Sequence, residues 1–450
     1  MSYIRDHYGR LISLSLPCPD LSLLDFLRQH QDQARFYWQD GVRGTAFAGV
    51  GAALELSAWG QERFAQIDRQ ARELFSEAYV EGAVQPRLFG GFAFRDDGIP
   101  DNAWADFPPA HFVLPHYLLT RQGSASYLTL NVQAPPEEDP RALLPELRAA
   151  LQTKIASLDV CPPAEPFAPA PLELRYPLDQ AAWRAMIDEA TQRIANGELK
   201  KVVLSRVAEI SYAQTVDVDS ALAYLDAAYP MTIRFLYEPR PHHAFFGATP
   251  ELLVEQQRDR LRTMALAGSR RRGQDAEDDA RQAQALLDDP KEREEHRLVI
   301  DALCAKLAPR MARLHIGQTQ VMALPNIQHL YTPLEGELLR PERLLSWVEL
   351  LHPTPALGGE PRDAAMNLIK ALEAAPRGWY AAPIGWIDAD GSGQFSVAIR
   401  SAVAQDRRVW LYAGCGVVAA SDAAREWDET ALKFRPMLAA LGAKEAIHHG

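Results

Sequence analysis

The sequence predicts an α+β fold, an α/β sandwich in which large antiparallel sheets are flanked by helices. Residues 383–402 (PIGWIDADGSGQFSVAIRSA) have the pattern of two strands around a polar turn that contains glycine, and strands joined in this way pair antiparallel. Between residues 179 and 211 a helical pattern passes directly into a strand pattern. The 450 residues are 47% hydrophobic, which is enough for a deep core in one large unit or in two or three domains.

The first part of the chain, residues 1–160, is predicted to be an N-terminal α/β portion. Apolar stretches alternate over 36–56, a helical segment lies near 61–78, and strands are expected near 88–95 and 112–132.

A proline-rich stretch follows this portion. It contains Pro162, Pro163, Pro166, Pro169 and Pro171, which exclude regular structure. The stretch is therefore a candidate linker, or a surface connection within one domain, before a second region over 172–445. Near the middle of the first part, Gly90 and Gly91 suggest a strand that passes close to another backbone.

The second region begins with a well-marked helix. Asp179 can cap it, Gly197 can end it, and apolar residues follow helical spacing between them at Trp183, Met186, Ile187, Ala190 and Ile194. In the strand that follows, KKVVLSRVAEI, alternation places Lys201 on one face with Val203 and Ser205. A lysine inside a strand is unusual. Burial would lower its pKa from about 10.4 and make it available as a general base.

The overall charge and the terminal sequence restrict the class of protein. A formal charge of −12, with no run of Lys or Arg, argues against nucleic acid or an anionic membrane as a partner. No segment has the apolar length of a membrane span and the N-terminus lacks the apolar core of a secretory signal, so we expect a cytoplasmic protein. The cysteines are Cys18, Cys161, Cys304 and Cys415, and their wide spacing indicates reduced thiols rather than a zinc site.

Two helices are expected to carry inward-facing carboxylates. In the last helix Glu426, Glu429 and Lys433 share one face, and that face becomes apolar toward its C-terminus. An exposed ion pair between Glu429 and Lys433 is the alternative interpretation. A second helix has Asp289 as N-cap, and Glu295 lies on its apolar face. In that helix Glu292 is expected to be the capping partner and His296 a packed core residue.

Two interior carboxylates need a counter-charge, and a hard divalent cation with oxygen ligands is the usual one. Mg²⁺ keeps several waters and can share its coordination sphere with a ligand's carboxylate, so two protein carboxylates are sufficient. If these carboxylates do face inward, the sequence therefore predicts a Mg²⁺ site shared by Glu295 and the carboxylates of the last helix.

Three further patterns have both a functional and a structural interpretation. In FSVAIRSA alternation places Arg400 beside small residues, which suits capture of a substrate carboxylate but also a structural salt bridge. Gly414, Gly416 and Ala419 have the spacing of a dinucleotide-binding fingerprint. That site needs a second parallel strand, and no such strand follows in the sequence. The backbone N–H groups of the two glycines could still hold an anion. Residues 388–391 faintly resemble a calcium loop, but a hairpin turn explains them better.

Ten ordered segments together resemble the chorismate-binding enzymes and, within these, the isochorismate synthases. They are KVVLSR, FFGATPELL, LAGSRRRG, EEHRLV, LPNIQHL, LHPTPALGG, GWYAAPIGW, VAIRSA, LYAGCGVV and EWDETALKF. The match is dense over about 180–442 and loose before it, through FGGFAF. The resemblance implies one structural domain overall, with the active-site cleft between two halves.

The resemblance also implies a role for each matching residue. Lys201 resembles the base that activates water, and Glu251 the acid that protonates the departing hydroxyl. The metal ligands would be Glu295 and Glu429 directly and Glu426 through water. The chorismate contacts would be Arg400, Lys433, Tyr412, Gly414, Gly416, Gly268, Ser269, His329, Thr354 and Ala356.

The subfamily follows from fewer residues. The similar enzymes that use ammonia typically have glutamine at the position of Lys201 and the motif GAPK where Gly358, Gly359, Glu360 and Pro361 stand here. The resemblance therefore implies an isochorismate synthase without a glutaminase subunit, a monomer or weak homodimer that acts on chorismate. It is most similar to menaquinone-type enzymes. The alternatives are a siderophore-pathway enzyme, a salicylate synthase, an anthranilate or aminodeoxychorismate synthase component, and a catalytically silent chorismate-binding protein.

Overall fold

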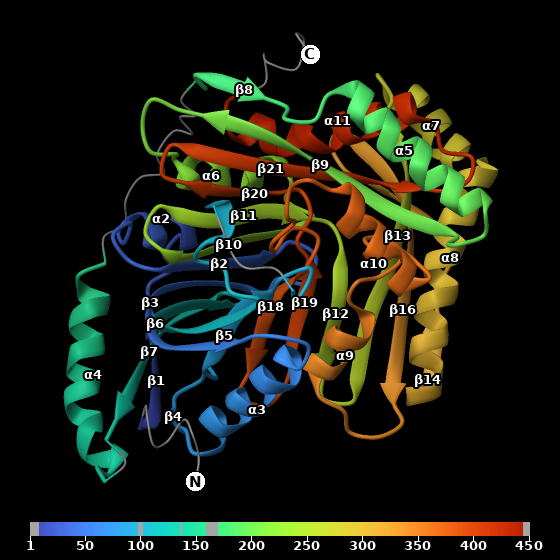
Figure 1. Cartoon of the computed structure of the whole chain (residues 1–450). Coiled ribbons are helices and arrows are strands. Elements are labelled where there is room, and N and C mark those ends of the chain that lie inside the picture. The colour runs from blue at the N-terminus through green and yellow to red at the C-terminus, as the bar shows by residue number, and fades with distance from the viewer. Residues whose placement is uncertain (1–8, 98–101, 136, 159–169, 444–450) are drawn as a thin grey trace.

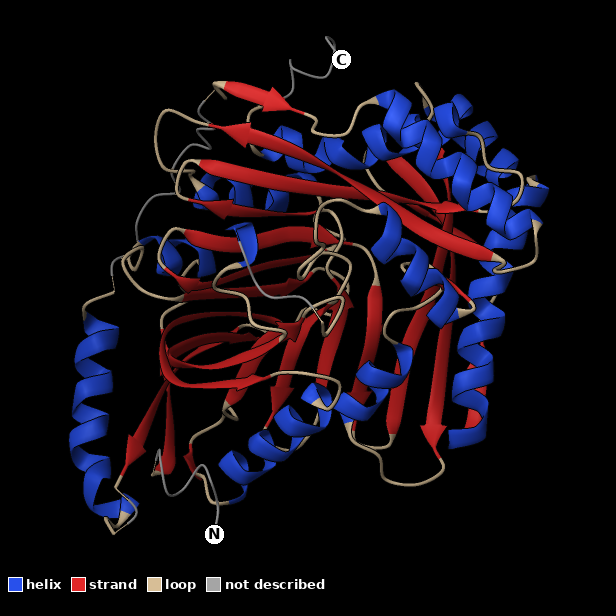
Figure 2. Ribbon diagram, viewed as in Figure 1, coloured by secondary structure: helices blue, strands red, loops and turns tan. Residues whose placement is uncertain are grey.

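The computed structural model describes residues 9–97, 102–135, 137–158 and 170–443. Its strands form one extended hydrogen-bonded network with the helices packed around it (Figures 1 and 2). The helices are α2 Leu23–Arg28, α3 Arg63–Ser76, α4 Pro140–Ala156, α5 Gln180–Ala195, α6 Val218–Ala228, α7 Ala276–Asp288, α8 Pro290–Leu307, α9 Leu344–Leu351, α10 Arg362–Leu372 and α11 Ala423–Ala440, with 3₁₀ turns η1 Asn102–Trp104 and η2 Ala308–Arg310.

The strands are β1 Arg10–Cys18, β2 Arg35–Asp40, β3 Ala46–Ala58, β4 Tyr79–Glu81, β5 Arg87–Phe92, β6 Ala110–Gln122, β7 Ala125–Ala134, β8 Glu173–Arg175, β9 Lys201–Ser211, β10 Ile233–Arg240, β11 His243–Thr249, β12 Leu252–Gln257, β13 Arg260–Arg271, β14 Met311–Ile316, β15 Gln320–Ala323, β16 Ile327–Leu338, β17 Gly359–Glu360, β18 Pro383–Asp388, β19 Gly393–Val397, β20 Ser401–Gln405 and β21 Arg408–Val417.

The strand network is antiparallel throughout the described residues except where β1 pairs with β4. One continuous path through it runs β16–β13–β12–β19–β18–β5–β6–β3–β2–β10–β11–β20–β21–β9. Helices α5 and α11 pack on β21 near one end of this path, and α7 and α8 pack on β13 near the other (Figure 1). The α+β fold with antiparallel sheets is as the sequence predicted.

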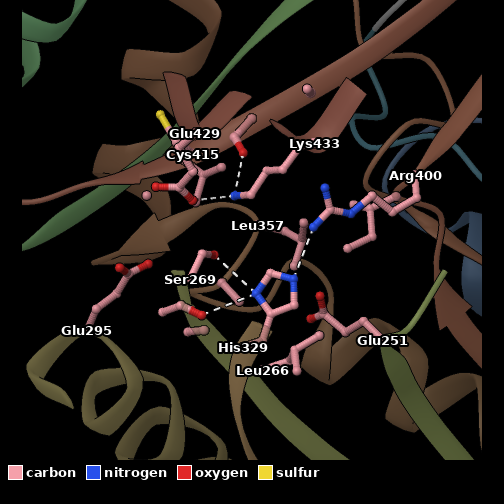
Figure 3. Close-up of a pocket in the computed structure, with 18 of the residues that line it drawn as sticks. Glu251, Leu266, Ser269, Glu295, His329, Leu357, Arg400, Cys415, Glu429 and Lys433 are labelled. Carbon is pink, nitrogen blue, oxygen red and sulfur yellow. Dashed lines mark hydrogen bonds and ion pairs between the residues drawn. The ribbon is translucent and has the colours of Figure 1, made fainter. Parts of the chain in front are cut away.

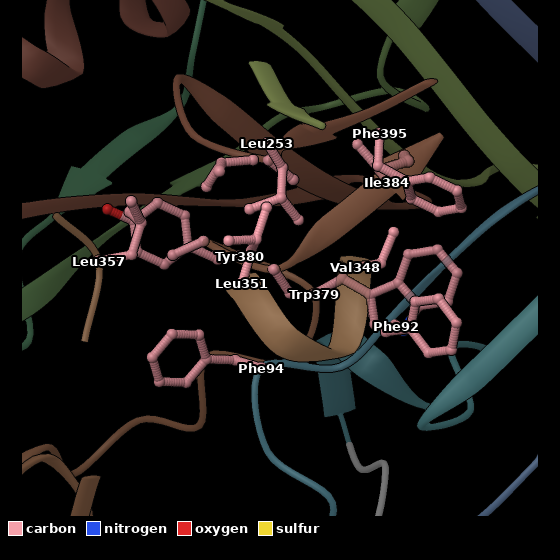
Figure 4. Packing of buried hydrophobic residues seen from close by; sticks show 14 of the residues in the cluster. Phe92, Phe94, Leu253, Val348, Leu351, Leu357, Trp379, Tyr380, Ile384 and Phe395 are labelled. Atoms are coloured by element: carbon pink, nitrogen blue, oxygen red, sulfur yellow. The ribbon is translucent and has the colours of Figure 1, made fainter. Parts of the chain in front are cut away.

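Strands from before and after the proline-rich stretch pair directly, β2 with β10 and β5 with β18. Most of that stretch, residues 159–169, lies outside the described residues. The two parts also share one buried cluster, in which Phe92 of β5, Val348 of α9 and Phe395 of β19 lie together (Figure 4). Burial of such large apolar side chains is the main favourable term in folding.

Several local predictions are confirmed. Helix α5 begins after Asp179, whose carboxylate accepts the N–H of Ala182 at 2.8 Å, and Gly197 follows the helix at φ +80°. A Cβ on Gly90 would lie 2.1 Å from the carbonyl oxygen of His111, so the predicted close approach of two backbones is real. Residues 388–391 form the turn between β18 and β19, as expected for a hairpin.

The strands expected near 112–132 are the hairpin β6–β7, in which Gly123 turns the chain at φ +60°. Two other predictions need correction. The strand expected near 88–95 ends at Phe92. The hairpin strand β19 ends at Val397, so the alternation that was expected to reach Arg400 stops before it. Arg400 instead lies in a bend at φ +51° before β20.

No helix among the described residues is both long and apolar enough to cross a membrane.

Candidate active site

A pocket lies between the two ends of the strand path. Strands β9 and β21 contribute from one end, β13 and β16 from the other, and α8 and α11 close it (Figure 3). The predicted site residues that line it are Glu251, Gly268, Ser269, Glu295, His329, Ala356, Arg400, Tyr412, Gly414, Gly416, Glu429 and Lys433. Segments that are far apart in the sequence therefore meet at one place, as the family resemblance implied.

Three predicted residues are not in the lining. Lys201 borders the pocket through its ion pair with Glu295. Glu426 lies behind the pocket wall and is only 1% exposed. Thr354 is buried, and its carbonyl oxygen accepts the N–H groups of Leu357 and Gly358. Thr354 thus holds the turn that places Ala356 and Leu357.

The pocket also has a set of mainly apolar lining residues that the sequence did not indicate. They are Val203, Leu266, Ala267, Leu357, Tyr380, Ile399, Ala413 and Cys415. Tyr380 and Leu357 lie in segments already singled out, GWYAAPIGW and LHPTPALGG, but nothing in their residue type distinguished pocket walls from core. The Tyr380 ring stacks on Tyr412, with centroids 5.1 Å apart, and Tyr412 accepts a hydrogen bond from the Trp104 indole N–H at 3.0 Å.

Lys201 is fully buried, and its Nζ lies 2.8 Å from Oε1 of Glu295. Alternation along β9 directs Lys201 and Val203 to the face that β21 lines with Gly414 and Gly416. A Cβ on Gly416 would lie 2.3 Å from Oε1 of Glu295 and 2.8 Å from Cε of Lys201. A side chain at position 416 would therefore displace this ion pair from its place.

Glu251 faces the pocket opposite Glu295 (Figure 3). Burial raises the pKa of Glu251 to about 8, although the positive charges of Lys201, Lys433 and Arg400 act in the other direction. The side chain is therefore protonated at neutral pH and can donate a proton.

His329 and Arg400 meet in the pocket wall, where Nη2 of Arg400 donates to Nε2 of His329 at 3.0 Å. Since the guanidinium can only donate, Nε2 must be unprotonated, and Nδ1 carries the hydrogen that faces the carbonyl of Gly268 at 3.1 Å. Burial, with the nearby Arg400 and Lys433 charges, lowers the pKa of His329 to about 3 and keeps this ring neutral. Nη1 of Arg400 is buried and has no hydrogen-bond partner in the described part of the chain. It is available to a substrate carboxylate.

Glu429 and Lys433 form an ion pair of 2.6 Å, and Lys433 also donates to the carbonyl of Gly414 at 2.8 Å. The alternative interpretation placed this ion pair on the exposed surface. The pair instead lines the pocket, and the side chains of Glu429 and Lys433 are 24% and 16% accessible. Burial acts to raise the pKa of Glu429, but the Lys433 ammonium outweighs it and holds that pKa below its usual value.

Glu292 has a different role from the one predicted. Asp289 caps α8 by itself, accepting the N–H groups of Lys291 and Glu292. The Glu292 carboxylate instead reaches across to β13 and accepts the N–H of Ser269 at 2.8 Å. His296 is a core residue as expected, bonded to Thr332 at 2.8 Å.

The carboxylates of α8 and α11 repel one another. Burial, then the charges of Glu295 and Glu429, raise the pKa of Glu292 to about 7, and burial and Glu429 likewise raise the pKa of Glu426. Lys291 partly compensates, since its Nζ lies 3.2 Å from Oε1 of Glu426. Such a donor set fits a hard divalent cation. No three acidic, histidine or cysteine side chains among the described residues form a group that could hold a metal alone.

The comparison with known families decides what kind of protein this is. A family model described as "Chorismate binding enzyme" matches residues 2–442. The chain belongs to the chorismate-binding enzymes.

Named relatives cover nearly the whole chain. The salicylate biosynthesis isochorismate synthase of Pseudomonas aeruginosa is 37% identical over 90% of this chain and 84% of its own length. Isochorismate synthase MenF of Bacillus subtilis is 32% identical over 97% and 94%, and isochorismate synthase EntC of Escherichia coli is 36% identical over 91% and 95%.

Solved structures of similar enzymes have the same fold as this chain. The menaquinone-specific isochorismate synthase MenF from Escherichia coli superposes with a TM-score of 0.82 and 26% identity over 96% of this chain and 95% of that one. Anthranilate synthase component I from Streptococcus pneumoniae shares the fold at 20% identity and a TM-score of 0.68, over 95% and 92% of the two chains. The predicted family and fold are thereby confirmed.

Proposed function

We propose that this enzyme is an isochorismate synthase, which reversibly converts chorismate to isochorismate with Mg²⁺. The observation that carries the proposal is that one pocket is bordered by a buried amine, Lys201, and lined by a carboxyl that holds its proton at neutral pH, Glu251. The named relatives that cover most of the chain are isochorismate synthases, which supports the same activity.

The reaction needs a base and an acid at different places. The step requires Lys201 as the neutral amine. Water then attacks C2 as its proton passes to Nζ of Lys201, the double bonds shift, and the C4 hydroxyl leaves with the proton of Glu251 as water. Return of a proton from Lys201 to Glu251 restores the enzyme. One water enters and one departs, so the atoms balance. A charged Glu251 could not do this, and burial of that residue keeps it protonated.

Arg400 and Lys433 would bind the carboxylates of the substrate. The free Nη1 of Arg400 supplies a charge-assisted donor inside the pocket. Lys433, which is held by Glu429, brings a second positive charge from α11. Glu295 and Glu429 would hold Mg²⁺, with Glu426 behind them acting through water. When bound, the ion would neutralise a substrate carboxylate and stabilise charge that moves into the conjugated system.

The fate of the product is a separate part of the proposal. The relatives' names include both salicylate biosynthesis and menaquinone-type enzymes. We favour the menaquinone type on the segments GWYAAPIGW and PALGGEPR, with siderophore or salicylate synthesis as the alternatives. A cytoplasmic monomer or weak homodimer without a glutaminase subunit completes the proposal.

Incubation with chorismate and Mg²⁺ in ¹⁸O-labelled water should give isochorismate labelled at C2. Because exchange of a hydroxyl between C4 and C2 changes bond energies little, the equilibrium should lie within about a factor of ten, or ~1.4 kcal/mol, of unity. Chromatography with mass detection measures both. Salicylate with stoichiometric pyruvate, or an aminated product after addition of ammonium, would assign the enzyme to another branch of the family.

Chelation should lower turnover at least tenfold, and Mg²⁺ should restore it. Mg²⁺ at a hundred times its dissociation constant should also stabilise the folded enzyme by about 2.7 kcal/mol, which thermal unfolding measures. Glu429→Gln should weaken both effects. The exposed Asp428, also on α11, is the matched control as Asp428→Asn. Full turnover in excess chelator would refute the metal assignment.

A further inference from the structure

The sheet edge beside the pocket is completed by side chains. Strand β17, Gly359–Glu360, pairs with β9 for only two residues, and one more backbone bond follows from the N–H of Val203 to the carbonyl of Gly358 at 2.8 Å. Beyond that bond, the carbonyl of Val203 and the N–H of Ser205 point into a gap in this edge of β9, between β17 and the three residues of β8 that pair with 209–211.

Arg377 and Glu373 occupy this edge. Nη2 of Arg377 donates to the carbonyl of Val203 at 2.7 Å, and Oε1 of Glu373 accepts the N–H of Ser205 at 2.7 Å. The two side chains pair with each other through bonds of 2.8 and 2.6 Å and are only 3% and 5% accessible. The ion pair thus provides the donor and the acceptor that a backbone peptide group would provide.

Arg377 contacts two other walls of the pocket, one through its guanidinium and one through its backbone carbonyl. Nη1 donates to the carbonyl of Leu357 at 2.9 Å, and the carbonyl of Arg377 accepts the N–H of Tyr380 at 2.8 Å. Leu357, Tyr380 and Val203 all line the pocket. Arg377 therefore joins three lining segments from behind and does not line the pocket itself.

We propose that Arg377 and Glu373 are positioning residues that fix the strand bearing Lys201 against the pocket walls formed by Leu357 and Tyr380. The inference rests on the proposed function, since it assigns Lys201 to the chemical step. Arg400 and Lys433 lie on other elements, the bend before β20 and helix α11, so substrate binding depends less on this pair. Loss of the pair should consequently lower kcat more than it raises KM, because small misplacements of a catalytic group are costly.

Arg377→Lys tests the proposal. Lysine keeps the charge, but its single ammonium cannot bond Val203, Leu357 and Glu373 in the fork geometry. We expect kcat to fall about 10- to 100-fold per folded molecule, with KM within about threefold of wild type. Glu373→Gln keeps the size of the side chain, and its kcat should also fall, but by less than that of Arg377→Lys. If Arg377→Lys does not fold, Glu373→Gln provides the test.

Arg87→Lys is the matched control. Arg87 makes a buried, bidentate pair with Asp388 at 2.6 and 2.9 Å, and neither residue lines the pocket. We expect it to lose thermal stability while its kcat stays within about twofold of wild type. Wild-type kcat in folded Arg377→Lys and Glu373→Gln, or an equal loss in Arg87→Lys, would overturn the inference. Absence of chorismate turnover in the wild type would instead refute the proposed function.

Discussion

Lys201→Met should lower kcat with chorismate by about 10²- to 10⁴-fold, the usual contribution of a positioned general base. Methionine keeps the length of the stem and fills the same space in β9, so the loss should report the missing amine rather than a cavity. Steady-state kinetics at fixed Mg²⁺, corrected for the folded fraction, measure the effect.

Two further substitutions separate the possible roles of this lysine. Lys201→Arg keeps a positive charge for Glu295 but stays protonated, so it should be as inactive as Lys201→Met if the residue is the base. Lys200→Ala is the matched control, because Lys200 is exposed and its backbone N–H bond to the carbonyl of Glu360 remains possible in alanine. Near-normal turnover in Lys201→Met would remove Lys201 from the chemical step.

The inward direction of three charged pocket residues could be predicted because they lie on regular elements, whereas most of the other lining residues were implied by the family resemblance. The alternation in β9 and the helical spacing in α8 and α11 give the inward direction of Lys201, Glu295 and Glu429 from the sequence alone. The structure adds that Lys201 and Glu295 form an ion pair, which no local pattern contains, because the partners lie on separate elements.

Local rules failed where tertiary contacts override them. The period-two pattern through FSVAIRSA is unbroken in sequence, yet the chain bends after Val397 and Arg400 takes a positive φ. Glu292 has the spacing of a capping box, but a backbone donor on β13 competes for its carboxylate. The role of the Arg377–Glu373 pair could not be predicted from the sequence either. Its partners are backbone groups of Val203 and Ser205, and only the folded structure shows that no strand in the described part of the chain pairs with them on that edge of β9.

Glu251→Gln should lower kcat by about 10²- to 10⁴-fold, since glutamine matches the shape of the carboxyl but cannot release a proton to the leaving hydroxyl. In the wild type, kcat/KM should fall above about pH 8, where Glu251 of the free enzyme loses its proton. The variant's residual activity should lack this alkaline limb. Glu255→Gln is the control, because Glu255 lies on β12, which begins directly after Glu251, but pairs with Arg43 at 2.7 Å and does not line the pocket.

The same pKa predicts how stability depends on pH. Because the folded-state pKa of Glu251 is raised from 4.5 to about 8, the folded enzyme holds a proton that the unfolded chain has already released between these values. The contribution of this residue to the free energy of unfolding is therefore fully present below about pH 4.5 and is lost as the pH rises to about 8. Glutamine cannot titrate, so Glu251→Gln should gain stability relative to wild type between pH 6 and pH 9, which urea denaturation at the two pH values measures. A difference between the two proteins that does not change with pH would show that Glu251 is already ionised at pH 6, and would exclude it as the acid that protonates the C4 hydroxyl.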